Sequence, residues 1–121
     1  MTTNIEFKTR MNARLKMFAL RIIKLFQSLP KTDEARIIGK QLLRSGTSVA
    51  ANYRAACRAR SGKEFYSKLS IVVEEADQAL FWMELLTDAE IVPLSRMAEL
   101  IAETEEILKI MATARKNTKI N

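Results

Sequence analysis

Apolar residues recur at intervals of three and four along four segments of this chain, which is the period of one face of an α-helix. The segments cover about residues 6–28, 33–60, 63–88 and 96–115, and β-branched runs typical of strands are scarce. Only three Gly and two Pro interrupt the 121 residues. Amphipathic helices joined by short connections predict an all-α fold, an antiparallel up-down four-helix bundle, as a single domain over residues 1–121.

Local signals mark the ends of these helices. Pro30 cannot continue a helix and therefore ends the first one. Thr32 is the expected N-cap of the second helix, and Ser61 with Glu64 forms the pattern of a capping box at the start of the third. Ser95 is the expected N-cap of the fourth helix.

The core is expected from the apolar side of each helix. The first three helices contribute Phe7, Met11, Leu15, Phe18, Ile22, Leu25, Phe26 and Leu29, then Ile38, Leu42, Val49, Tyr53 and Ala56, then Phe65, Leu69, Val72, Val73, Ala76, Ala79, Leu80 and Met83. The fourth contributes Met97, Leu100, Ile101, Thr104, Ile107, Leu108 and Met111.

Charge is distributed unevenly around a formal net charge of +6. Residues 31–63 hold eight basic and two acidic residues, net +6, whereas residues 64–106 hold two basic and eleven acidic residues, net −9. On the second helix, the 3.6-residue period brings five cations into one sector opposite the core side. This basic ridge consists of Arg36, Lys40, Arg44, Arg54 and Arg58.

Two interpretations of the basic ridge are open. The ridge is either a surface that binds the phosphates of RNA or DNA, or a set of cations that pair with the acidic third helix of the same or a neighbouring subunit. Exposed aromatic residues that could stack on bases are few, which argues against reading the bases of a single strand. The leading hypothesis is nucleic-acid or nucleoprotein binding, and the alternative is a self-assembling protein–protein scaffold with no nucleic-acid role.

The third helix carries a second apolar surface away from its core side. Four large residues, Ile71, Phe81, Trp82 and Leu85, share one sector of this helix. Apolar clusters of this kind on a bundle helix indicate a contact with another chain. We therefore predict a homo-oligomer with these residues at its interface.

Enzyme chemistry has little support in the residue content. The chain contains no histidine, so histidine-dependent triads and histidine-ligated metals are excluded, and no glycine-rich phosphate-binding motif is present. We expect no catalytic residues, no metal site and no cofactor. A single cysteine, the absence of a signal-peptide pattern and the absence of a long apolar stretch predict a cytoplasmic protein without a membrane segment.

The order of several residues resembles a known family. The relevant stretches are Gln41–Ala55, Cys57–Ser61, then Glu64, Phe65 and Leu69, and finally Glu74–Asp77. Together they resemble the four-helix-bundle proteins called the S23 or 23S rRNA intervening-sequence family, over about residues 15–112. Many members have Ala-Glu-Gly after the Asn matched by Asn52, whereas this chain has Tyr53-Arg54-Ala55.

The resemblance implies an antiparallel four-helix bundle that assembles as a homopentamer. The chain is also similar to the accessory variability protein of diversity-generating retroelements, which implies contact with nucleic acid and with a reverse transcriptase. No catalytic residue is implied for any position.

Overall fold

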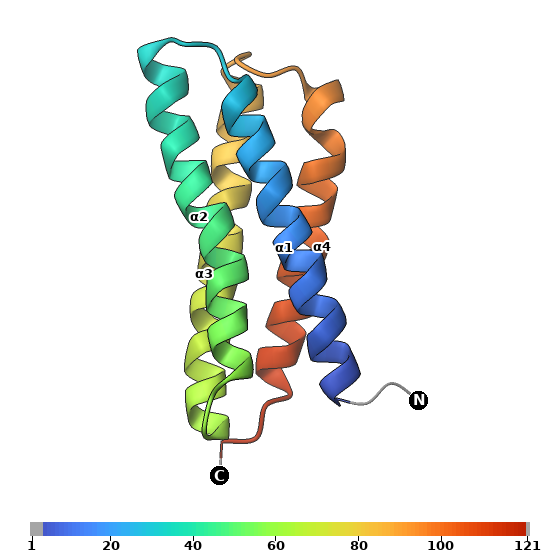
Figure 1. Cartoon of the computed structure of the whole chain (residues 1–121). Coiled ribbons are helices and arrows are strands. Elements are labelled where there is room, and N and C mark those ends of the chain that lie inside the picture. The colour runs from blue at the N-terminus through green and yellow to red at the C-terminus, as the bar shows by residue number, and fades with distance from the viewer. Residues whose placement is uncertain (1–3, 121) are drawn as a thin grey trace.

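The computed structural model describes residues 4–120 and contains four helices, α1 (Asn4–Ser28), α2 (Asp33–Cys57), α3 (Gly62–Asp88) and α4 (Leu94–Lys116). They run alternately up and down and pack side by side, with α2 and α3 in the most extensive contact (Figure 1). The predicted all-α four-helix bundle is confirmed.

The start of α2 and the start of α3 follow the predicted caps. Thr32 accepts a hydrogen bond from the backbone N–H of Ala35 at 3.3 Å, and Ser61 accepts one from Glu64 at 3.1 Å. Only this half of the capping box forms, because the Glu64 carboxylate lies 3.8 Å from Nε of Arg60 instead.

Two helix ends differ from the prediction. Helix α2 ends at Cys57 and not at residue 60, because Ser61 caps α3 in an extended conformation and the chain must leave the helix before it. Ser95 is not an N-cap. Helix α4 begins at Leu94 after the extended Pro93, whose carbonyl accepts the N–H of Arg96 at 3.0 Å.

The core lies along the bundle axis and contains most of the predicted residues. Leu15, Ile22, Val49, Leu69 and Ile107 are fully buried. Phe7 was wrongly predicted as a core residue, since it lies in the first turn of α1, where fewer neighbours cover it, and is 36% exposed. The predicted core residues Phe26, Leu29, Ile38, Phe65, Val73, Leu80, Ile101 and Leu108 are only half-buried.

Two glycines allow α2 to approach α1. A Cβ on Gly46 would lie 2.9 Å from Cγ1 of Ile22, and a Cβ on Gly39 would lie 2.6 Å from Cδ1 of Leu29. Ile22 is fully buried and branched at Cβ, so its side chain cannot rotate away. At Gly39 the contacts are the flexible end of the half-buried Leu29 and, at 3.1 Å, the edge of the half-buried Phe26 ring, both of which have more room to shift than Ile22.

We expect Gly46→Ala to destabilise the bundle by about 1–2 kcal/mol, since overpacking outweighs the better helix propensity of alanine. Gly39→Ala is the matched control, and it should be neutral or stabilising by up to about 1 kcal/mol. Urea unfolding of both variants measures the difference. Equal effects of the two substitutions would contradict this account of the contact between α1 and α2.

An ion-pair cluster joins α1 to α4 on the outside of the core. The guanidinium of Arg14 donates to both carboxylate oxygens of Glu103, at 2.9 and 2.7 Å, and it also lies 3.1 Å from Glu106. The hydrogen bonds from Arg14 lower the pKa of Glu103, and the charge of Arg21 contributes to the same shift.

This cluster predicts a pH dependence of stability. The pKa of Glu103 is lower in the folded protein than its ordinary value of 4.5, so its contribution is present above that value and is lost as the pH falls through the folded pKa. We expect Glu103→Gln to cost about 1 kcal/mol at neutral pH and to weaken the acid dependence below pH 4.5. The control is Glu105→Gln at an exposed position of α4. Urea unfolding at several pH values would contradict the prediction if both variants gave the same acid dependence.

Candidate nucleic-acid interface

The structure divides the basic ridge into two parts with different environments. In the first part, Arg44 donates to Glu75 of α3 at 2.9 Å and to Gln78 at 2.9 Å, while Arg36 lies 3.7 Å from Asp33. Lys40 is exposed between them. Arg44 of the basic ridge therefore pairs with the acidic third helix of its own chain.

Glu75 is nearly buried, whereas the neighbouring acidic residues Glu74 and Asp77 are exposed. The Glu75 side chain is only 10% exposed, and Arg44 supplies its counter-charge. The pair is cross-helical, so neither helix considered alone indicates that this carboxylate is buried.

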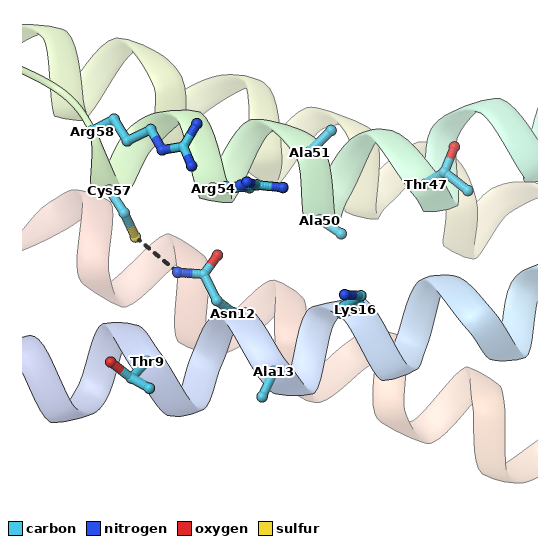
Figure 2. Close-up of a pocket in the computed structure, with 10 residues that line it drawn as sticks. All are labelled: Thr9, Asn12, Ala13, Lys16, Thr47, Ala50, Ala51, Arg54, Cys57 and Arg58. Atoms are coloured by element: carbon cyan, nitrogen blue, oxygen red, sulfur yellow. Dashed lines mark hydrogen bonds between the residues drawn. The ribbon is translucent and has the colours of Figure 1, made fainter.

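The second part of the ridge forms one wall of a groove between α1 and α2. The groove has a volume of about 690 Å³. Figure 2 shows Arg54 and Arg58 on the α2 side and Lys16 on the α1 side of this basic groove. Its complete lining is Thr9, Asn12, Ala13, Lys16, Thr47, Ala50, Ala51, Arg54, Cys57 and Arg58.

The basic groove contains cations without acidic neighbours. No carboxylate of residues 4–120 lies within 4 Å of the charged groups of Lys16, Arg54 or Arg58, and all three side chains are exposed. Arg54 lies in the last turn of α2 and Arg58 is the C-cap residue that follows the helix, so the two are separated by about 6 Å along the helix axis. The electrostatic potential in the groove is therefore positive over a length of at least one helical turn.

Small side chains explain why a groove exists here. Ala13 of α1 and Ala50 and Ala51 of α2 leave the space between the two helices open, and Ala50 points into it in Figure 2. Thr9 and Thr47 donate their hydroxyl hydrogens to carbonyls of the preceding turn, at 2.9 and 2.7 Å. Hydrogen-bond donors for an anion therefore come mainly from the three cations.

Cys57 lies at one end of the groove and is half-buried. Its Sγ accepts an N–H from Asn12 of α1 at 3.5 Å, the contact drawn as a dashed line in Figure 2. The hydroxyl of the fully buried Tyr53 has no well-formed hydrogen bond. Burial raises the pKa of Tyr53, and the neighbouring Cys57 raises it further. Tyr53 lies next to Cys57 but is not among the residues that line the groove.

Lys16 and Asn12 were not predicted as site residues. A helical wheel compares residues of one helix, whereas the groove combines side chains of two helices. The only sequence signal was the basic character of residues 1–30, which hold six basic residues and one acidic residue, net +5.

The predicted oligomer interface on α3 is unevenly exposed. Phe81 is 54% and Ile71 is 37% exposed, whereas Trp82 and Leu85 are half-buried. Phe81 contacts Trp82 edge-to-face with ring centroids 5.0 Å apart. The indole N–H of Trp82 is buried without a hydrogen-bond partner in the described chain.

The α3 patch, defined as Ile71, Phe81, Trp82 and Leu85, has neighbours on α2. Since Arg44 faces Glu75 and Gln78, the antiparallel register places Ile37 level with Trp82 and Leu85. Ile37 is 64% exposed, so it extends the apolar surface beyond α3.

Residues 4–120 contain neither a metal-binding cluster nor a membrane-spanning helix. They contain no group of three or more Cys, Asp or Glu side chains placed to hold a metal ion. None of the four described helices is long and apolar enough to cross a bilayer.

Comparisons with known proteins agree with the bundle and its sequence pattern. The family model described as 23S rRNA-intervening sequence protein matches residues 9–113. A crystal structure at 1.70 Å of a protein with unknown function from the S23 ribosomal protein family of Bacteroides thetaiotaomicron VPI-5482 is 33% identical, with a TM-score of 0.82. The similarity covers 88% of this chain and 98% of that one. No curated protein matches this chain. The chain therefore belongs to the 23S rRNA-intervening sequence protein family.

Proposed function

We propose that this protein is a non-enzymatic bundle that binds nucleic acid, alone or in a nucleoprotein, through the basic groove. The observation that supports the proposal most is the grouping of Lys16, Arg54 and Arg58 without a carboxylate of the described chain nearby. Cations placed so close together repel one another, and a polyanion that displaces their counterions relieves this repulsion.

The rest of the basic ridge has a smaller role in this proposal. Arg44 already has a buried carboxylate as partner, and Arg36 is close to Asp33. Lys40 can add to the attraction at long range, because it is exposed on the same helix. We therefore place the phosphate contacts at Arg54 and Arg58 and add Lys16 to the predicted set.

Binding to a structured RNA that contains both stems and loops, and to duplex DNA, tests the proposal. Gel-shift titrations at several salt concentrations should show binding that weakens steeply with salt, because each phosphate contact releases counterions. An absence of binding to every nucleic acid at low salt would refute the proposed function, since phosphate contacts are strongest there.

A self-assembling scaffold is the second candidate, and the exposure of the α3 patch favours it. A ring that is 54% exposed beside a buried, unpartnered indole N–H is typical of a surface that another chain covers. The family resemblance suggests five copies, and its retroelement branch suggests a reverse transcriptase as a protein partner. Self-assembly through the α3 patch does not by itself exclude nucleic-acid binding, since the basic groove and the α3 patch use different residues.

A further inference from the structure

We propose that the basic groove binds one phosphodiester strand by its backbone, so that single-stranded segments and loops are preferred to a continuous duplex. This inference rests on the proposed function and names the form of nucleic acid that the site accepts. It follows from the shape of the groove, from the position of its cations and from the side chains at its base.

The shape of the groove favours a thin chain. Packed helices lie about 8–10 Å apart, so the space between α1 and α2 is narrow compared with a double helix. Its lining includes Ala13, Ala50 and Ala51, whose short side chains allow a strand to approach the backbone of both helices. A duplex would contact only the rims of such a groove.

The cations are placed on both walls of the groove. Lys16 projects from α1, Arg54 from α2 and Arg58 from the C-cap of α2, so a strand lying between the helices can contact all three (Figure 2). A duplex lying across the outside of α2 would instead need the outer ridge. There Arg44 pairs with Glu75 and Arg36 lies near Asp33.

The base of the groove offers no group that recognises bases by stacking. No aromatic side chain is among its ten lining residues, and the Asn12 amide N–H groups already donate to Cys57 and to the carbonyl of Lys8. Sequence-tolerant binders of single strands normally add aromatic stacking to a basic channel. Because this groove lacks aromatic side chains, we expect it to bind the phosphate backbone with an affinity that depends little on the identity of the bases.

Fluorescence anisotropy with a single-stranded RNA and an RNA duplex, each of about 20 nucleotides or base pairs, tests the inference. At about 50 mM salt the single strand should bind at least about 10-fold more tightly than the duplex. Three phosphate contacts predict a slope of roughly −2 for log affinity against log salt. Oligo(U) and oligo(A) should bind within about 3-fold of one another, because stacking does not contribute.

Cysteine protection locates the strand directly. Ala51 lines the groove and is exposed, so Ala51→Cys with Cys57→Ser supplies one accessible thiol in the groove. The control is Ala102→Cys with Cys57→Ser, since Ala102 is exposed on α4. Saturating single-stranded RNA should slow iodoacetamide alkylation of the groove thiol by at least about 5-fold and leave the control unchanged, because the strand covers only the groove.

The outcomes separate the two proposals. Equal or tighter binding of the duplex, or equal alkylation of the Ala51→Cys variant with and without single-stranded RNA, would overturn the strand inference and leave the proposed function standing. No binding of either nucleic acid at low salt would refute the proposed function itself.

Discussion

Reversing the charge of Arg54 and Arg58 together is expected to reduce the affinity for structured RNA by at least about 100-fold at low salt. Both side chains line the basic groove, and the substitutions to Glu would turn two of its three cations into repulsive charges. The binding that remains should also depend less on salt, since about two phosphate contacts are lost.

The matched control is Arg36→Glu with Lys40→Glu, which lies on the same helix and on the same predicted ridge. Both double variants change the net charge by −4, from +6 to +2, so a nonspecific effect of net charge would be equal in the two. Neither pair is buried, and circular dichroism checks that both variants remain helical. If the control lost as much affinity as Arg54→Glu with Arg58→Glu, the whole ridge and not the groove would be the binding surface.

Introducing charge into the α3 patch should convert an oligomer into monomers. We expect the wild-type protein to self-associate at micromolar concentration, and the pentamer suggested by the resemblance would contain five 13.8-kDa subunits, 69 kDa in all. Phe81→Glu would place a carboxylate on the most exposed ring of the patch, and desolvating an unpaired charge in an interface costs several kcal/mol. Size-exclusion chromatography with light scattering measures the mass.

Met17→Glu is the control for this substitution. Met17 is 60% exposed on α1, so the change is chemically similar but lies outside the α3 patch. We expect it to leave the mass unchanged. A monomeric wild-type protein would refute self-association, and a Phe81→Glu variant of unchanged mass would show that another surface forms the interface.

Arg44 is unsuitable for separating nucleic-acid binding from assembly. This residue lies in the middle of the basic ridge, but its guanidinium already pairs with Glu75 of the same chain. In the structure Arg44→Glu would place a second carboxylate against the nearly buried Glu75, and the bundle itself would be destabilised. Arg54 and Arg58 have no such partner in the described chain, which makes them the better positions.

The helices and most of the core could be predicted because their signals are local. The spacing of Leu15, Phe18, Ile22 and Leu25 determines one face of α1 without reference to any other helix. The start of α4 was predicted wrongly, because Ser95 is a favourable capping residue. The helix instead begins two residues earlier in the chain than a Ser95 cap implies, since the carbonyl of Pro93 accepts the N–H of Arg96.

The site was only partly predictable, because it depends on how helices face one another. A wheel of α2 places Arg44 beside Arg54, but Arg44 faces α3 and Arg54 faces the space next to α1. The same wheel contains no information on Lys16, which completes the groove from another helix. The orientation of neighbouring helices, which no single-helix pattern contains, decides which cations are paired and which remain available.

The pair between Arg44 and Glu75 also bears on how the chain selects one arrangement of its helices. Apolar stripes such as those of α2 and α3 could slide by one turn with little change in buried area, so hydrophobic pattern alone discriminates weakly between such alignments. A slip by one turn that brings Ser48 to the place of Arg44 would leave Glu75 without a counter-charge against the core, a penalty of about 3–5 kcal/mol. The pair therefore disfavours slippage in that direction, in a chain whose many leucines and alanines discriminate little between alignments.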